Sequence, residues 1–186
     1  MLVEGERWPG FLHVIDHPDG RILVDTGLID SIPELDEQWS PRFDASVIPR
    51  DVAFVVNTHL HFDHCGGNRL FAGVPIYVQR VEREAARGED YTIPGWVEFE
   101  GASYVELDGE AELAPGVRVL PTPGHSPGHQ SVLVDTEEGL VVVAGDVAHR
   151  WDDFDDPANG AAATLKALAP RRVWLAHETS SLDLDV

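Results

Sequence analysis

Residues 58–64 read Thr58-His59-Leu60-His61-Phe62-Asp63-His64, and they directly follow a β-branched, apolar run at Val52–Asn57. Four side chains that commonly bind metals therefore occur within six residues, just after a predicted buried strand. His59 and His61 are two positions apart in an extended segment, so both can face one ion. Asp63 and His64 follow a turn and are expected to face a second ion. The alternative, a polar loop with chance histidines, is disfavoured by this density of ligand-type residues.

Three further candidate ligands also follow predicted strands. These are His125 after Gly116–Leu120, Asp146 after Leu140–Ala144, and His177 at the end of Arg172–Ala176. Because the strand ends of a layered sheet converge on one rim, we expect all seven side chains to meet. The simpler alternatives are a turn histidine at 125, a helix-capping aspartate at 146 and an isolated histidine at 177.

Seven ligands exceed the three or four protein side chains that one zinc ion takes, and they indicate two divalent ions that share a carboxylate. Imidazole and carboxylate ligands suit zinc, our first choice, and also iron, manganese or cobalt, since no thiolate selects zinc. Water held by such ions loses its proton near neutral pH. The sequence therefore predicts a hydrolase in which a metal-bridging hydroxide attacks a carbonyl, with Asp63 passing a proton to the leaving group.

The remaining sequence repeats one order of elements. A hairpin, a helix and a strand are predicted at Phe11–Asp25, Ile29–Gln38 and Val52–Asn57, and again at Ser131–Ala144, Pro157–Leu168 and Arg172–Ala176. Pro33 restricts the first helix to a start or a break there, and Asp155 or Asp156 is expected to cap the last helix. This order predicts an α/β fold in one domain, residues 1–186, with two mixed β-sheets packed face to face under outer helices.

Between these two halves we expect a helix opening at Gly66, a strand at Val74–Gln79 and a solvated helix at Val81–Arg87. The polar, Gly/Pro-punctuated and aromatic stretch Gly88–Gly101 is interpreted as a loop or lid.

Composition restricts the class of protein. A hydrophobic content of 43% over 186 residues is typical of a globular domain, and 33 acidic against 13 basic residues give a net charge of −20. Such acidity disfavours nucleic acid or membrane partners and leaves a small-molecule substrate, with the oligomeric state open. The stretch Met1–Arg7 lacks the features of a signal peptide, and the single cysteine, Cys65, fits a reducing compartment, so we expect a cytoplasmic protein.

Two longer motifs carry a family resemblance. Residues 58–68, Thr-His-Leu-His-Phe-Asp-His-Cys-Gly-Gly-Asn, resemble the signature of the metallo-β-lactamase superfamily. Within that superfamily, their sequence is most similar to the motif of the quorum-quenching N-acyl homoserine lactonases. Residues 122–129, Thr-Pro-Gly-His-Ser-Pro-Gly-His, resemble that group's next motif, and Gly145-Asp146 its bridging aspartate. The resemblance implies an αββα sandwich. It also implies one metal on His59, His61 and His125, a second on Asp63, His64 and His177, and Asp146 between them.

The resemblance implies a lactone or related ester as substrate, with N-acyl homoserine lactones first. His149 stands where those lactonases have a tyrosine that assists the substrate carbonyl, so a histidine donor is expected there, or else a solvated residue at a helix start. A glyoxalase II-like thioesterase is one alternative, because His177-Glu178-Thr179 is similar to its last ligand motif. That family adds a C-terminal helical domain that this sequence does not show. The second alternative is an iron-dependent redox protein of the same fold.

Three residues near the ligands have open roles. Asp25 can orient a ligand histidine or cap a turn. His129 is expected to support the His125 loop, and Cys65 to be a small buried residue instead of a reactive thiol.

Overall fold

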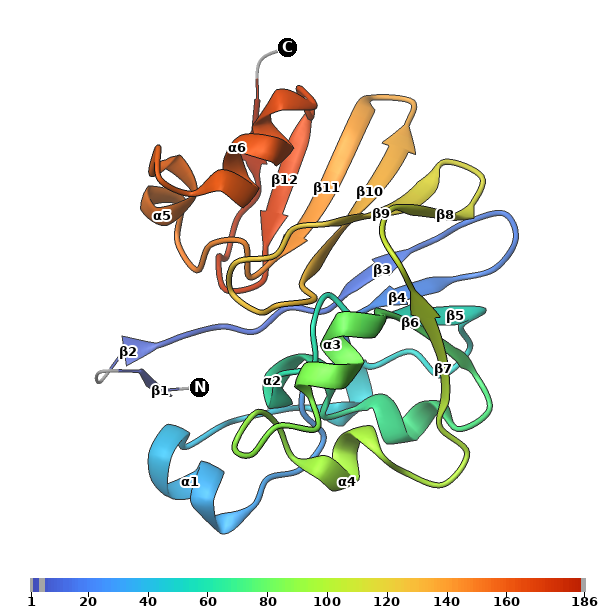
Figure 1. The fold of residues 1–186 in the computed structure, drawn as a ribbon, viewed down its shortest axis with the longest axis vertical. Helices are drawn as coiled ribbons and strands as arrows, with labels where there is room; N and C mark the ends of the chain where they lie inside the picture. The colour runs from blue at the N-terminus through green and yellow to red at the C-terminus, as the bar shows by residue number, and fades with distance from the viewer. Residues whose placement is uncertain (1, 4–5, 185–186) are drawn as a thin grey trace.

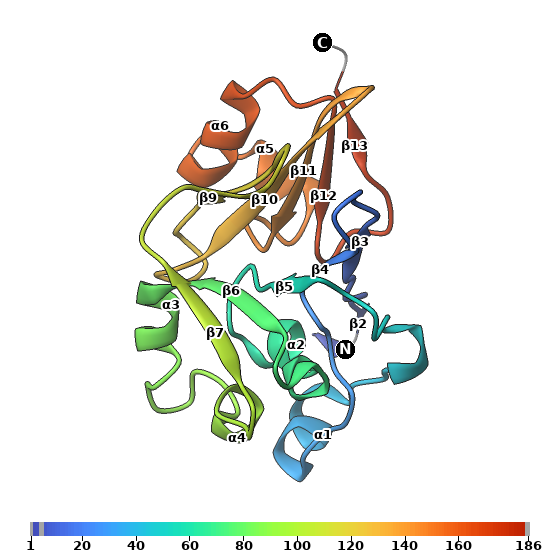
Figure 2. The same cartoon turned by 90° about the vertical axis from the view of Figure 1, so that its right-hand side faces the viewer.

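Two packed β-sheets with helices on their outer sides form the protein (Figure 1 and Figure 2). The computed structural model describes residues 2–3 and 6–184, so the ends of the predicted domain and part of Met1–Arg7 lie outside the described residues. One sheet has five strands in the order β3-β4-β5-β6-β7, and the other has six in the order β13-β12-β11-β10-β9-β8. The predicted αββα sandwich is confirmed.

Both sheets mix parallel and antiparallel pairs. The first contains β3 (His13–Ile15), β4 (Ile22–Val24), β5 (Phe54–Val56), β6 (Pro75–Gln79) and β7 (Ser103–Leu107). The second contains β8 (Ala111–Ala114), β9 (Val117–Pro121), β10 (Gln130–Thr136), β11 (Gly139–Gly145), β12 (Arg172–Leu175) and β13 (Leu182–Asp183). A separate small sheet pairs β1 (Leu2–Val3) with β2 (Glu6–Arg7). The strands β4 to β7 run parallel, as does β11 beside β12.

Helices cover the outer face of each sheet (Figure 2). On the first sheet these are α1 (Pro33–Trp39), α2 (Phe62–Cys65), α3 (Arg80–Ala85), α4 (Pro94–Val97) and the 3₁₀ turns Ala45–Val47 and Asn68–Phe71. On the second they are α5 (Trp151–Asp155) and α6 (Gly160–Ala167). Pro33 begins α1, where its missing N–H has no helical partner to lose. Among the described residues, no helix has the length and apolar character needed to span a bilayer.

Alternation along the strands produces the layers. In β4, Ile22 and Val24 point into the space between the sheets, whereas Leu23 packs outward beneath the helices. In β10, Val132 faces the other sheet and Leu133 faces α5 and α6. Successive strand residues point to opposite faces, so strands buried on both sides are apolar throughout.

Four sequence predictions are corrected by the structure. No α-helix begins at Gly66: α2 ends at Cys65, the Gly67 N–H bonds to the Gly27 carbonyl, and only the 3₁₀ turn Asn68–Phe71 follows. The helix at 81–87 is not a solvated face throughout, because Glu82 and Arg83 are buried.

The loop interpretation of Gly88–Gly101 is wrong in part, since α4 forms there and Trp96 and Val97 are buried. Finally, Asn159 caps α6 by accepting the Ala162 N–H. Asp155 instead belongs to α5, and Asp156 ends that helix.

Candidate metal centre

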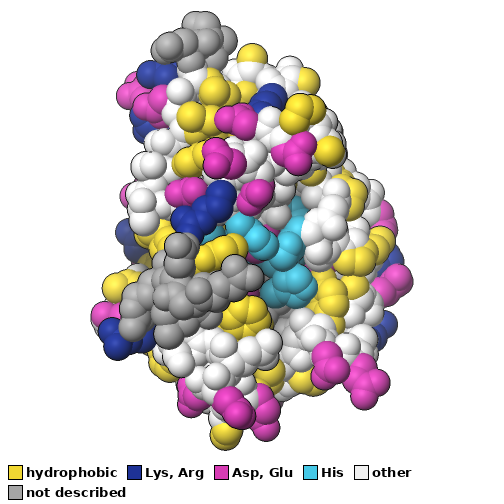
Figure 3. Space-filling model, turned by 90° about the vertical axis from the view of Figure 1, so that its left-hand side faces the viewer, with side chains coloured by type: hydrophobic (Ala, Val, Ile, Leu, Met, Phe, Trp, Pro, Cys, Tyr) yellow, Lys and Arg dark blue, Asp and Glu magenta, His cyan; other side chains and the backbone are white. Residues whose placement is uncertain are grey.

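The predicted ligands meet where four strands end, on the face shown in Figure 3. The chain leaves β5 toward His59, β9 toward His125, β11 toward Asp146 and β12 toward His177. Histidine side chains gather there in a hollow rimmed by apolar and acidic groups (Figure 3). All eight residues singled out in the sequence fall into groups whose ligand atoms lie within 4.8 Å of one another: His59, His61, Asp63, His64, His125, Asp146, His149 and His177.

Three histidines form one trio. His61 Nδ1 lies 3.0 Å from His59 Nε2 and 3.0 Å from His125 Nε2. Burial lowers the pKa of His59 well below its usual range, lowers that of His61, and brings the pKa of His125 to about 4. These rings are therefore neutral near pH 7, which is the form that binds a metal.

Asp63, His64 and His177 form a second trio. The Asp63 Oδ2 atom lies 3.8 Å from His64 Nε2 and 3.7 Å from His177 Nε2. Burial alone would lower the pKa of both histidines, but nearby carboxylates, Asp146 foremost, raise it, and for His64 by a large margin. The second trio thus lies in surroundings that favour a positive charge.

Asp146 lies between the two trios. Its Oδ1 is 3.3 Å from His64 Nε2, and its Oδ2 is 3.5 Å from His125 Nε2 and 3.3 Å from His177 Nε2. Burial would raise its pKa, but the charge of His64 and hydrogen bonds from His149 and His177 outweigh burial and hold the pKa well below its usual range. A carboxylate whose oxygens lie within 3.5 Å of ligand nitrogens from both trios can serve two ions.

Outer partners fix the orientation of the histidines in the second trio. The Nδ1 of His64 donates to Asp25 Oδ2 at 2.8 Å, and the Nδ1 of His177 donates to the Pro9 carbonyl at 2.6 Å. Each bond leaves Nε2 free of its proton in the neutral ring and directed at Asp146. Asp25 also accepts the Thr58 N–H at 2.7 Å and so holds both ends of the ligand segment 58–64, as carboxylates behind metal-binding histidines do.

His129 supports the centre without belonging to it. Burial lowers its pKa to about 3, its Nδ1 bonds Thr122 Oγ1 at 2.9 Å, and its Nε2 accepts the Asp146 N–H at 3.0 Å. Gly145 makes this possible: its φ is +60°, and a Cβ there would lie 2.8 Å from His129 Nε2 and 2.8 Å from Thr58 Cβ. Only glycine combines this backbone conformation with such close packing.

The residues present fit a pair of divalent ions. Tetrahedral zinc with Zn–N bonds of about 2.0–2.1 Å places neighbouring nitrogens roughly 3.4 Å apart, close to the separations in the three-histidine trio. His64 Nε2 and Asp146 Oδ1 are buried and make no hydrogen bond of acceptable geometry. Orphaned buried polar atoms are rare, and a metal ion would satisfy both.

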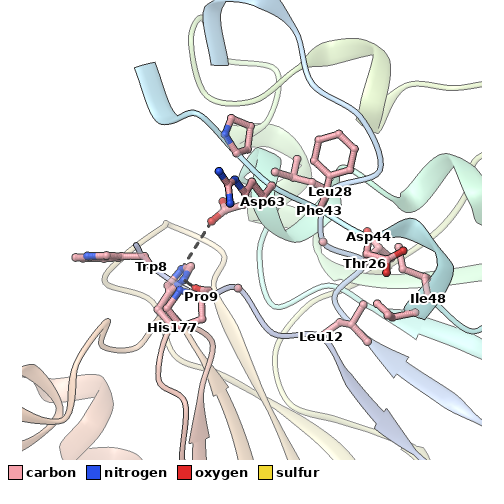
Figure 4. Close-up of a pocket in the computed structure, with 15 residues that line it drawn as sticks. Trp8, Pro9, Leu12, Thr26, Leu28, Phe43, Asp44, Ile48, Asp63 and His177 are labelled. Carbon is pink, nitrogen blue, oxygen red and sulfur yellow. Dashed lines mark hydrogen bonds and ion pairs between the residues drawn. The ribbon is translucent and has the colours of Figure 1, made fainter. Parts of the chain in front are cut away.

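A cleft of about 710 Å³ opens over the centre. Six of the eight predicted residues line it, together with an apolar wall that contains Ile32, Leu35, Trp39, Phe62 and Ile93. None of the described residues that line this cleft is lysine or arginine. A second, smaller cavity of about 180 Å³ adjoins the centre at Asp63 and His177, between Trp8 and Phe43 (Figure 4).

His149 stands at the edge of the cleft with 36% of its side chain exposed. Its Nε2 lies 3.3 Å from Asp146 Oδ2, and its ring packs against Trp8 with centroids 5.2 Å apart.

Sequence reasoning missed Trp8, whose ring packs against His149 and His177, because an isolated tryptophan does not indicate a metal site. It also missed Glu82, whose burial depends on distant loops. Cys65 is buried, and burial raises the pKa of its thiol to about 12.

Residues 5–181 match the family model described as the Metallo-beta-lactamase superfamily. The chain belongs to this superfamily. An N-acyl homoserine lactonase from Bacillus cereus is 34% identical over 169 residues, which are 80% of this chain and 67% of that relative.

Solved structures that match this chain share its fold. An N-acyl homoserine lactone hydrolase with the product N-hexanoyl-L-homoserine at its catalytic metal centre aligns with a TM-score of 0.77 at 28% identity, over 92% of this chain and 82% of that one. A putative metallo-β-lactamase from Thermotoga maritima aligns with a TM-score of 0.69 at 26% identity, over 99% and 94% of the two chains.

Proposed function

We propose that this chain is a dinuclear metal-dependent hydrolase that opens lactones or related esters, with N-acyl homoserine lactones as the first candidates. The observation that carries the proposal is the pair of ligand trios joined by Asp146 at the floor of a cleft with one apolar wall. Similarity to the Bacillus cereus lactonase supports the choice of substrate.

In this proposal His59, His61 and His125 hold one ion, and Asp63, His64 and His177 hold the other, with Asp146 shared. Zinc is the first choice, and iron, manganese or cobalt would suit the same ligands. When bound, such ions polarise a carbonyl and acidify water to near-neutral pKa. The outer bonds of His64 to Asp25 and of His177 to Pro9 hold both rings with Nε2 inward.

Asp63 and His149 are the proposed catalytic residues. The Asp63 side chain is 16% exposed and lines the cleft, so its carboxylate can receive a proton and pass it to a leaving alkoxide. The Nε2 of His149 lies 3.3 Å from Asp146 Oδ2 at the edge of the cleft, where the imidazole can donate to the substrate carbonyl. It would replace the tyrosine of the similar lactonases.

The lining of the cleft favours an uncharged substrate with an apolar tail. Glu34 and Asp90 add negative charge to it, and the described lining residues include no lysine or arginine. A glutathione thioester or a β-lactam carboxylate would find no cationic partner among them. The wall formed by Leu35 and Trp39 can pack an acyl chain, and each buried CH₂ contributes about 0.8 kcal/mol.

A substrate panel on protein of measured metal content tests the proposal. N-acyl homoserine lactones, a simple ester, a glutathione thioester and a β-lactam are compared, with Asp146→Ala as the metal-site control. We expect the highest kcat/KM for the lactones and none above background for Asp146→Ala. A higher kcat/KM for the thioester, or redox turnover with bound iron, would contradict the proposal.

A further inference from the structure

Glu82 on α3 is a fully buried carboxylate outside the ligand set. Its two oxygens accept four hydrogen bonds. Oε1 accepts the Leu60 N–H at 2.8 Å and the Tyr91 hydroxyl at 2.5 Å, and Oε2 accepts the Ser126 hydroxyl at 2.8 Å and the Gly128 N–H at 3.0 Å. A buried carboxylate with this many donors is a fixed point in the structure.

Three of the four donors belong to the segments that form the three-histidine trio, and the fourth, Tyr91, packs against His61. Leu60 lies between His59 and His61, and Ser126 follows His125 in the chain. Glu82 therefore ties together two ligand loops that are more than sixty residues apart in sequence. Without it, the N–H groups of Leu60 and Gly128 would be buried and unpaired, which is costly.

Two close contacts support this link. A Cβ on Gly128 would lie 2.3 Å from the Glu82 backbone nitrogen, so the loop of His125 can reach α3 only with glycine at this position. The ring of Tyr91 packs on the ring of His61, with centroids 4.8 Å apart, while its hydroxyl is held by Glu82. The carboxylate thus orients both loops and a side chain that lies against a ligand.

We propose that Glu82 is a positioning residue that sets the spacing of His59, His61 and His125 and thereby the affinity of this trio for a divalent ion. It touches neither ion nor substrate and acts through Leu60, Tyr91, Ser126 and Gly128. The inference rests on the proposed ligand set of the metal centre, which it extends to a residue behind the ligands.

Glu82→Gln is a sharp test, because each carboxylate oxygen accepts one backbone N–H. A hydroxyl can rotate, but a backbone N–H cannot, so the glutamine NH₂ must face a donor in either orientation. One of the two loops then loses its anchor. Losing an outer partner of a metal ligand lowers metal affinity about 10- to 100-fold.

The experiment measures both dissociation constants of Zn²⁺ by competition with a chromogenic chelator, on wild type, Glu82→Gln and the exposed same-helix control Glu84→Gln. We expect one of the two ions to bind about 10- to 100-fold more weakly to Glu82→Gln only, with the other unchanged. The absorption spectrum of the Co²⁺-loaded variant should change, and kcat should recover at saturating metal. A purely structural role would instead lower both affinities and kcat together.

Ser126→Ala with Tyr91→Phe gives a second test that does not depend on the folding of Glu82→Gln. These changes keep both backbone bonds and remove two hydroxyl donors, so we expect the same ion to bind about fivefold more weakly per lost bond. If Glu82→Gln and the double variant Ser126→Ala/Tyr91→Phe both bind Zn²⁺ with wild-type affinities, the proposed role of Glu82 is overturned. Wild-type protein that binds fewer than two ions would instead overturn the metal centre and, with it, this inference.

Discussion

Asp25→Asn should weaken the binding of one ion without disturbing the fold. The Asp25 side chain accepts the Thr58 N–H through Oδ1 and the His64 Nδ1–H through Oδ2, in a site closed to water. An asparagine must keep its oxygen on the Thr58 N–H, since that donor cannot rotate, so its NH₂ faces His64. The amide then donates to Nδ1, and the ring proton moves to Nε2, where the ion should bind.

The expected loss follows from that tautomer. Removing the partner of a ligand histidine lowers metal affinity about 10- to 100-fold, which corresponds to about 1.4–2.7 kcal/mol. The affected ion should be the one on Asp63, His64 and His177, and the other should bind as in wild type. Chelator competition with Zn²⁺ measures both constants, and Asp36→Asn, an exposed change of the same charge on α1, is the control. Unchanged binding of both ions in Asp25→Asn would refute the argument.

Three other substitutions test separate parts of the centre. Asp146→Ala should lower bound metal and abolish turnover together, as elemental analysis and kinetics will show; full metal with near-normal rate would make Asp146 a simple turn residue. His149→Ala should cost about a hundred- to a thousandfold in kcat, roughly 2.7–4 kcal/mol, at full metal content, and His149→Tyr should restore activity. An unchanged kcat/KM would remove His149 from catalysis. Trp39→Ala should reduce the preference for long acyl groups, measured as the increase of kcat/KM with acyl length. An unchanged increase would show that the acyl group of the substrate does not pack against Trp39.

The clustering of the candidate ligands could be predicted from the sequence, because these residue types are chemically distinct and follow apolar strands. His59, His125, Asp146 and His177 follow β5, β9, β11 and β12. The strands β9, β11 and β12 run in one direction, so their ends lie at the same rim, which the end of β5 in the other sheet also reaches. The double hairpin–helix–strand order likewise predicted the two sheets. Both features are local patterns repeated along the chain, so they can be recognised without knowing how distant segments pack.

Features that depend on distant contacts could not be predicted. Glu82 lies in a charged, helix-compatible run, and only the loops of Leu60, Tyr91 and Ser126 bury it. The Gly88–Gly101 segment is interpreted as a loop from its sequence because it is polar and punctuated by Gly and Pro, yet Trp96 is buried beneath Arg69. Asp25 is compatible with a turn cap by sequence, with φ at +59°, but its carboxylate contacts His64 across 39 positions.

The most direct test of the proposed dinuclear hydrolase is a metal titration of lactone opening. Metal-free protein receives increasing Zn²⁺, and the opening of an N-acyl homoserine lactone is followed by proton release at each step. Because seven ligands form two trios around a shared carboxylate, the rate should reach its plateau at about two ions per chain. A plateau at one ion per chain, or no ring opening at two, would contradict it.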